Sequence, residues 1–192
     1  MEYTFVGLDV KAAGIHAVVR PTGEHWETAR HDRGIAETSE RLQSIHPTLV
    51  VMEANGNFEL PVAGTLATMG LPFALIPPHN IREFAKATGR FRQDQTHADL
   101  LAYFAELVRP RVRPLPPELI EQLSALRKRR QQLQEMLSLE RTRLAEAPAA
   151  LQRGIKNHVY FLEKSVLLIG DEISRTVRSS TAWRSSITPG LW

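Results

Sequence analysis

A proline- and arginine-rich segment at residues 109–117, RPRVRPLPP, divides the chain into two parts with different periodicity. Proline fixes φ and has no backbone N–H, so this segment cannot continue a helix or a central strand. Short strand-like and helix-like segments alternate before it, and leucines recur at helical spacing after it. We therefore predict an α/β domain at residues 1–108, a linker at 109–117, a helical region at 118–180 and a frayed tail at 181–192.

The first part has the pattern of a mixed sheet with flanking helices. Three apolar, β-rich segments near the N-terminus, separated by short turns, predict an antiparallel meander. The later run TLVVM is typical of a buried parallel strand. Strands that alternate with helices favour a sheet with helices packed against it. The predicted strands are residues 3–10, 14–20, 25–29, 48–52 and 73–76, and the predicted helices are residues 34–45, 60–69 and 80–88.

The second part predicts two long amphipathic helices joined near Pro148. In the first helix, leucines follow alternating three- and four-residue steps, which is the heptad pattern of a coiled coil. The second helix carries apolar residues at helical spacing over residues 151–177. The two form an antiparallel helical hairpin. A heptad pattern does not say which helix fills the seam, so an arm folded on itself and a dimerisation arm both stay open. The leucines are Leu119, Leu123, Leu126, Leu133, Leu137 and Leu144.

The composition excludes several classes of protein. The chain of 192 residues has no cysteine, which excludes a disulfide framework, a zinc ribbon and thiol catalysis. No segment approaches the roughly 18 apolar residues of a membrane span, and the N-terminus lacks the basic region of a signal peptide. These features predict a soluble cytoplasmic protein. The formal net charge of +3 favours a polyanionic partner only slightly.

Three acidic residues stand where ligands are expected. Asp9 lies near the end of the first strand, Glu53 follows TLVVM directly, and Asp94 comes where a helix is predicted to begin. Ligands sit at the carboxyl ends of strands in open α/β sheets, and a carboxylate cluster there suits two-metal phosphoryl transfer. Simpler interpretations remain: Asp9 as a turn residue, Glu53 as the cap of the next helix and Asp94 as an N-cap.

Three blocks of the sequence, in order, resemble one protein family. The blocks are VGLDVKAAG, VVMEANGNFELPVAGTLATMGLPFALIPPHNIREFAKATGR and RQDQTHADLLAYFAELVRPRVRPLP, and the later RRQQLQEMLSLERTRL and AWR match as well. They resemble bacterial insertion-sequence transposases with a DEDD tetrad, the Piv-like recombinases. The resemblance covers essentially the whole chain and implies an RNase H-like (RuvC-like) N-terminal domain.

The resemblance also implies a site. The first aspartate of the family falls on Asp9, its glutamate on Glu53 and the first aspartate of its third block on Asp94. The second aspartate of that block falls on His97, which departs from the family pattern. Helical spacing predicts that positions 94 and 97 share a face and that Asp99 points away. The metal implied is Mg²⁺, and a histidine ligand suits Mn²⁺ better than Mg²⁺.

A second departure concerns the C-terminus. Family members continue into a domain that carries a serine thought to act as nucleophile, whereas this chain ends at TPGLW. Ser185 and Ser186 precede that point and are not assigned its role. The expectation is a chain that stops before the serine domain, as a truncated copy, a frameshifted copy or a deliberately isolated domain.

The partners implied by the resemblance are DNA and a guide (bridge) RNA, and the helical region predicts a homodimer or a higher homo-oligomer. Basic side chains that can contact phosphates lie before Asp94, on the linker and on the first long helix. A solvated helix face is the alternative for them. They are Arg90, Arg92, Arg109, Arg111, Arg113, Arg127, Lys128, Arg129 and Arg130.

The function expected is therefore metal-dependent DNA strand cleavage and exchange in transposition. The chain alone is expected to bind nucleic acid without completing recombination. Two other functions stay open: a catalytically silent RNA- or DNA-binding module derived from a transposase, and a structural coiled-coil oligomer. Metal binding would distinguish the enzyme from the silent binding module. Binding to nucleic acid that is lost with salt would argue against the structural oligomer.

Overall fold

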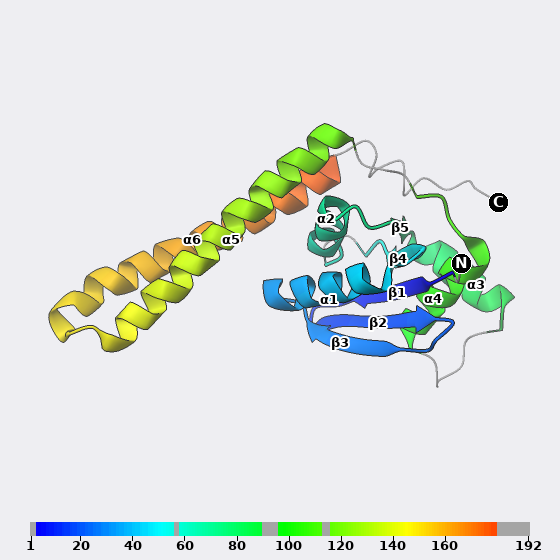
Figure 1. Cartoon of the computed structure of the whole chain (residues 1–192), viewed down its shortest axis with the longest axis horizontal. Coiled ribbons are helices and arrows are strands. Elements are labelled where there is room, and N and C mark those ends of the chain that lie inside the picture. The colour runs from blue at the N-terminus through cyan, green and yellow to red at the C-terminus, as the bar shows by residue number, and fades with distance from the viewer. Residues whose placement is uncertain (1–2, 56–57, 90–95, 113–115, 180–192) are drawn as a thin grey trace.

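A five-stranded mixed sheet forms the centre of the molecule, and a long helical hairpin projects from it (Figure 1). The computed structural model describes residues 3–55, 58–89, 96–112 and 116–179. The sheet order is β3-β2-β1-β4-β5. The strands are β1 (Phe5–Val10), β2 (Gly14–Arg20), β3 (His25–Ala29), β4 (Leu49–Glu53) and β5 (Phe73–Ile76). The predicted strands are confirmed, with ends that differ by at most two residues.

The first three strands form the predicted antiparallel meander, and the last two run parallel to β1. β1 pairs with β2 antiparallel and with β4 parallel, and β4 pairs with β5 parallel. All six residues of β1 are buried because the strand lies in the middle of the sheet. This mixed sheet with flanking helices confirms the α/β class and is consistent with an RNase H-like fold.

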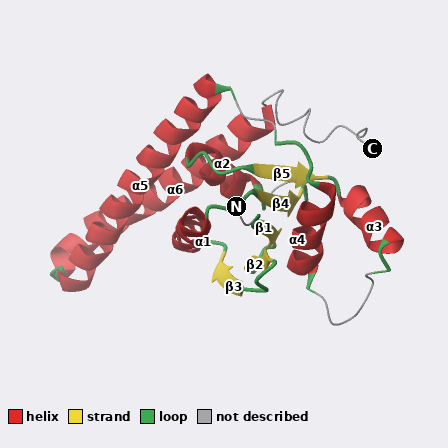
Figure 2. Cartoon of the chain, turned by 45° about the vertical axis from the view of Figure 1, so that its right-hand side comes forward, coloured by secondary structure: helices red, strands yellow, loops and turns green. Residues whose placement is uncertain are grey.

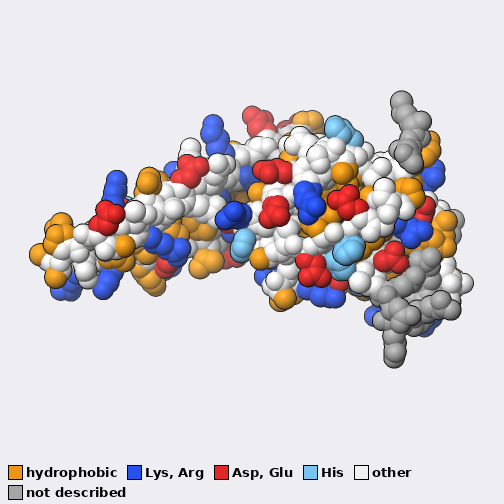
Figure 3. All heavy atoms as spheres, turned by 60° about the horizontal axis from the view of Figure 1, so that its bottom comes forward, with side chains coloured by type: hydrophobic (Ala, Val, Ile, Leu, Met, Phe, Trp, Pro, Cys, Tyr) orange, Lys and Arg blue, Asp and Glu red, His pale blue; other side chains and the backbone are white. Residues whose placement is uncertain are grey.

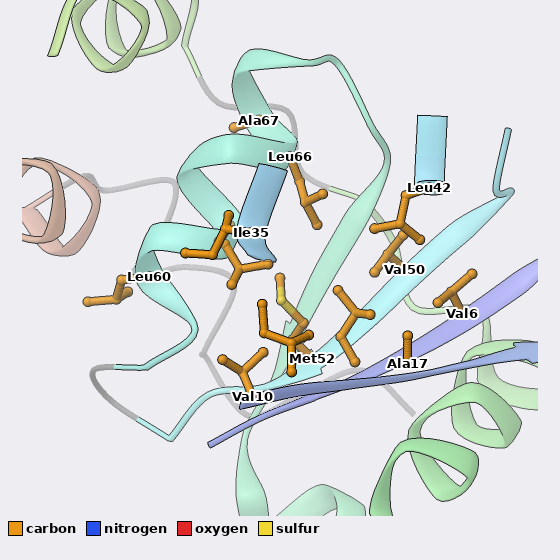
Figure 4. Close-up of a cluster of buried hydrophobic side chains, with 14 of the residues drawn as sticks. Val6, Val10, Ala17, Ile35, Leu42, Val50, Met52, Leu60, Leu66 and Ala67 are labelled. Atoms are coloured by element: carbon orange, nitrogen blue, oxygen red, sulfur yellow. The ribbon is translucent and has the colours of Figure 1, made fainter. Parts of the chain in front are cut away.

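Alternate side chains of each strand enter two different cores, one on each face of the sheet. On one face, Val6, Leu8 and Val10 of β1 pack with Val50 and Met52 of β4 against helices α1 and α2 (Figure 4). On the other face, the alternate residues pack against helices α3 and α4. Figure 2 shows these helices on the two sides of the sheet. The helices are α1 (Asp32–Ile45), α2 (Leu60–Thr68), α3 (Pro78–Ala87) and α4 (His97–Val108).

Helix α4 lies directly against β1 because Gly7 has no side chain. A Cβ built on Gly7 would lie 2.1 Å from the Ala98 carbonyl oxygen and 2.3 Å from the Ala102 backbone nitrogen. Both atoms belong to the backbone of α4, so no side-chain movement could relieve such a contact. The small residues Ala98 and Ala102 complete the close approach, and Val18 of β2 packs beside them. Gly7 thus sets the height of α4 above the sheet.

The second part of the chain is an antiparallel pair of helices, α5 (Pro117–Glu146) and α6 (Ala149–Ser179). Leu133 and Leu137 of α5 pack against Leu162 of α6 along the outer part of the hairpin. The α5 leucine seam is therefore filled by a helix of the same chain. Nearer the sheet, Leu123 of α5 and Ile173 of α6 join the core formed with α1 and α2.

The hairpin and the sheet therefore share one hydrophobic core where the hairpin meets the sheet. The domain boundary at residue 118 stays a prediction. No helix in the described part of the chain is long and apolar enough to cross a lipid bilayer.

Candidate functional site

Two of the predicted acidic residues come together at the ends of neighbouring parallel strands. The pairing of β1 with β4 places Leu8 opposite Met52. Asp9 and Glu53 are the next residues along the two strands, so they lie side by side at the same edge of the sheet. Leu8 and Met52 enter the core under α1 and α2, and alternation turns the two carboxylates to the opposite face, under α4.

Asp9 is a buried carboxylate with a lysine partner. Its side chain is only 5% exposed, and Lys11 Nζ lies 2.6 Å from its Oδ2. Burial of an ionised carboxylate costs free energy unless a cation or hydrogen bonds compensate for it. Lys11 supplies that cation from the turn after β1, where its backbone N–H donates to the Gly14 carbonyl. The ammonium is itself largely exposed, so it can leave without unfolding the strand.

His97, the first residue of α4, reaches the second carboxylate. Its Nε2 contacts Oε2 of Glu53 at short range. A carboxylate only accepts, so Nε2 carries the hydrogen. The side chains are 32% exposed for His97 and 14% for Glu53, so the pair lies at the mouth of the site and Asp9 lies deeper.

The same contact changes the acidity of the imidazole. The hydrogen bond to Glu53 raises the pKa of His97 above its ordinary 6.5, against the opposing effect of burial. The negative charges of Glu53 and Asp9 raise this pKa further, and the positive charge of Lys11 lowers it. All four side chains therefore interact within one site.

The helix that carries His97 begins later than predicted. Thr96 is the N-cap of α4, with an extended backbone at φ −72° and ψ 154°, and its hydroxyl accepts from the Asp99 backbone N–H at 3.2 Å. The prediction that positions 94 and 97 share a helix face requires a helical turn through residue 96, and the extended backbone of Thr96 does not form one. Asp94 lies outside the described residues.

Asp99 pairs with a basic residue of the meander. Asp99 lies 3.4 Å from Arg20 of β2, which also holds Glu106 of α4 with Nε at 2.6 Å from Oε2. These contacts fasten the side of α4 away from Glu53 to the meander. Asp99 thus helps to attach α4 to the meander, and its orientation relative to Asp94 stays a prediction.

Two further polar residues, which sequence reasoning missed, lie in one row with Asp9 across the sheet. The antiparallel register pairs Asp9 with His16 of β2, and His16 with Glu27 of β3. A hollow of about 470 Å³ lies along this row, lined by Asp9, Lys11, His16 and Glu27 among others. A prediction of strand register from the turns 11–13 and 21–24 would have been needed to find them.

Comparison with known protein families gives a match over most of the chain. The family model of DEDD transposases of the IS110 type, described as "Transposase", matches residues 6–149, which is more than half of the chain. The chain belongs to the DEDD transposase family. A search of the curated proteins found no match. Membership supports a role in transposition, with DNA as the substrate class.

The donor atoms of this transposase chain suit a hard divalent cation. Asp9 and Glu53 offer carboxylate oxygens, which Mg²⁺ and Mn²⁺ prefer, and His97 offers a nitrogen that Mn²⁺ accepts more readily. Within the described residues, no three acidic or histidine side chains already form a group that could hold an ion. Instead, Lys11 forms an ion pair with Asp9, and His97 contacts Glu53.

The predicted phosphate-contacting residues of the transposase have different surroundings. Arg109 ends α4 and lies over the rings of Tyr3 and Phe5, at 4.8 and 5.1 Å from their centres. Arg130 is paired with Asp32 of α1, and Arg129 donates to Gln132 at 3.3 Å. Arg111 and Lys128 are exposed. Arg90, Arg92 and Arg113 lie outside the described residues.

Proposed function

We propose that this chain is the metal-dependent, strand-cleaving part of a DNA transposase. Asp9 and Glu53 would hold a divalent cation, Mg²⁺ or Mn²⁺, with His97 and Asp94 as the other ligands. The observation that carries the proposal is the meeting of Asp9, Glu53 and His97 at one corner of the sheet, from three segments far apart in the sequence.

The roles of the chain's own residues follow from their positions. Asp9 is deepest and best shielded from water, so its carboxylate would make the strongest contact to a cation. Glu53 and His97 stand at the mouth, where the phosphodiester would approach. Lys11 neutralises Asp9 before a cation arrives and would then be free to contact a substrate phosphate. Bound cations would supply activation of a nucleophilic oxygen and stabilisation of the leaving oxygen.

His97 carries a second role in this proposal. A protonated imidazole cannot bind a cation, so His97 must lose its proton to become a ligand. The contact with Glu53, which raises the pKa of His97, therefore opposes metal binding in mildly acidic solution. The resemblance of this position to a family aspartate supports the assignment of His97 to the site.

DNA would reach the site along the hollow beside Asp9. The exposed Lys11 and the polar side chains of His16 and Glu27 line that hollow. Basic residues 90 and 92, which precede Asp94, would steer the DNA backbone towards it. A guide RNA as a second partner, and a cytoplasmic location, rest on the resemblance alone.

A second copy of the chain would pair through the outer face of α6. Tyr160 and Leu167 are seven residues apart, as are Phe161 and Leu168, so the four share one helix face. Each is more than half exposed, and hydrophobic side chains are visible along the hairpin in Figure 3. The seam of α5 is already filled by α6, which leaves this second apolar face for another molecule.

One observation favours a different function, that of a silent nucleic-acid-binding module. Both carboxylates already have a basic partner within the chain itself, Lys11 for Asp9 and His97 for Glu53. If these contacts were permanent, the site would be structural. Metal binding separates the two functions, because a silent module would bind nucleic acid without it.

Calorimetric titration with Mn²⁺ tests the proposal. The chain should bind Mn²⁺, and Asp9→Asn should weaken binding by at least about tenfold, because it removes the charge and keeps the shape. Asp99→Asn is the matched control, since it changes an aspartate on the far side of α4. Equal affinity in the chain and in Asp9→Asn would refute the proposal.

A further inference from the structure

A second hollow opens on the other side of the sheet, between α1, α2 and the first half of α5. Its volume is about 730 Å³. The carboxylate site faces α4, whereas this hollow is bounded by the helices of the opposite face (Figure 2). Four cationic side chains line it (Arg33, Arg127, Lys128 and Arg130) against two acidic ones (Asp32 and Glu40). The hollow is therefore a cationic cleft separate from the carboxylates.

The cations of this cleft are not equivalent. Arg130 pairs with Asp32, to which Gln134 also donates, and Arg130 packs 3.6 Å from the position that a Cβ on Gly170 of α6 would take. Arg130 therefore joins α5 to α1 and α6, and its charge is compensated. The charges of Arg130 and Asp32 therefore cancel each other within the cleft.

Arg127 has no such compensation. It is half-buried, and its guanidinium donates from Nη1 to the hydroxyl of Thr68 at the end of α2. No carboxylate is paired with it among the residues that the structure describes. Burial lowers the pKa of Arg127, and no neighbouring charge acts in the other direction. A partly desolvated cation without a counter-charge is costly, and an anion entering the cleft would remove that cost.

The surroundings of Arg127 suit an oxyanion with several acceptor atoms. A guanidinium presents donors in a planar fork that matches a phosphate. The Thr68 hydroxyl donates to the Thr65 carbonyl at 2.9 Å, which fixes its position next to Arg127. Lys128 follows on α5 and Arg33 faces it from α1, and both are exposed. Two exposed cations thus line the same cleft as one that is held in place.

We propose that this cleft binds a phosphodiester backbone, with Arg127 as the central contact and Arg33 and Lys128 on either side. The proposal rests on the proposed nucleic-acid substrate and adds a second contact surface on the opposite face of the sheet. A strand held at Arg127 would lie on the opposite face of the sheet from Asp9 and Glu53. Arg129, which points elsewhere on α5, and Arg130, which is paired, take no direct part.

Binding to a labelled DNA duplex and to a labelled RNA hairpin, measured in EDTA over a series of salt concentrations, tests the cleft. Arg127→Gln should weaken binding to at least one of the two by roughly tenfold and reduce the salt slope by about one. The probe that responds identifies the nucleic acid, and either response supports the proposal. EDTA removes divalent cations, so metal binding at the carboxylate site does not contribute to this measurement. The proposal for the cleft and the proposal for the carboxylate site can therefore fail independently.

Arg129→Gln is the matched control, because it removes the same charge from the same helix outside the cleft. Its affinity should stay within about twofold of that of the unchanged chain. Arg127→Gln removes an uncompensated cation, so its thermal midpoint should not fall. If it unfolds nevertheless, the exposed pair Arg33→Gln and Lys128→Gln takes its place. Equal losses in the Arg127 and Arg129 variants, or no loss in either, would overturn the proposal.

Discussion

His97 at the start of α4 contacts Glu53 at the end of β4, across 44 residues of sequence. The contact places an imidazole against one of two adjacent carboxylates, and Asp9 is close enough to raise the pKa of that imidazole. The contact between His97 and Glu53 depends on the distance between α4 and the sheet, which Gly7 allows to be short. Backbone packing and the chemistry of the site are therefore linked through one helix.

The first prediction concerns Gly7. Gly7→Ala places a methyl group against the backbone of α4, which must shift. We expect a loss of unfolding free energy of about 1–3 kcal/mol and weaker Mn²⁺ binding, because His97 moves with the helix. Chemical denaturation and calorimetry measure the two effects.

Gly64→Ala is the control for this variant. Gly64 lies inside α2, and its added Cβ would meet only Ile173 and Val177 at ordinary distances of 3.6 and 3.7 Å. Alanine in a helix interior should stabilise the fold by about 0.5–1 kcal/mol. If Gly7→Ala behaved like Gly64→Ala, α4 would not rest on β1 as described.

The second prediction concerns pH. The folded-state pKa of His97 lies above the unfolded value of about 6.5, so protonation of the pair stabilises the fold. This stabilisation is fully present below pH 6.5 and is lost as the pH rises through the folded-state pKa. The His97 ring resonances should titrate above pH 6.5 in NMR spectra, and Glu53→Gln should return the pKa towards its ordinary value. An unchanged titration in that variant would show that the contact is absent in solution.

The third prediction concerns the identity of residue 97. His97→Asp places a carboxylate next to Glu53 and Asp9, so repulsion between like charges should lower stability in the absence of metal. The same change adds an oxygen ligand, so the affinity for Mg²⁺ should rise relative to that for Mn²⁺. Thermal unfolding with and without each ion measures both effects. An unaltered preference between the ions would remove His97 from the ligand set.

The fourth prediction separates the two apolar faces of the hairpin. Leu162 is 1% exposed in the seam between α5 and α6, and Leu162→Ala should cost about 2–5 kcal/mol of unfolding free energy. Leu167 is 67% exposed, and Leu167→Ala should change the stability of the single chain by less than about 0.5 kcal/mol. Sedimentation should show weaker self-association for Leu167→Ala. Unchanged association would exclude this face of α6 as the interface.

The sequence predicted the strands and most helices because each carries a local signal. The alternation in β2, the apolar run of β4 and the leucines of α5 are readable without tertiary information. The helix α4 begins later than the sequence predicts, because two residues that favour the N-cap position, Asp94 and Thr96, compete there. Spacing alone could not show that Thr96 takes the cap.

The site was only partly predictable for a related reason. Asp9 and Glu53 follow strands, and strand ends are where ligands gather. Lys11, His16 and Gly7 became relevant only through the register of β1 with β2 and through the approach of α4. Similarly, the sequence grouped Arg127 with Arg129 and Arg130, and only the packing of α5 on α1 and α2 distinguishes their surroundings.

Diffraction from crystals grown with Mn²⁺, collected at a wavelength where manganese scatters anomalously, would show whether Asp9 and Glu53 hold a cation. The account predicts an anomalous peak within coordination distance of Asp9 and Glu53, with Lys11 displaced from Asp9. It also predicts that the hydrogen bond between His97 and Glu53 is replaced by a contact with the ion. Intact Lys11–Asp9 and His97–Glu53 pairs, with no peak between the carboxylates, would contradict it.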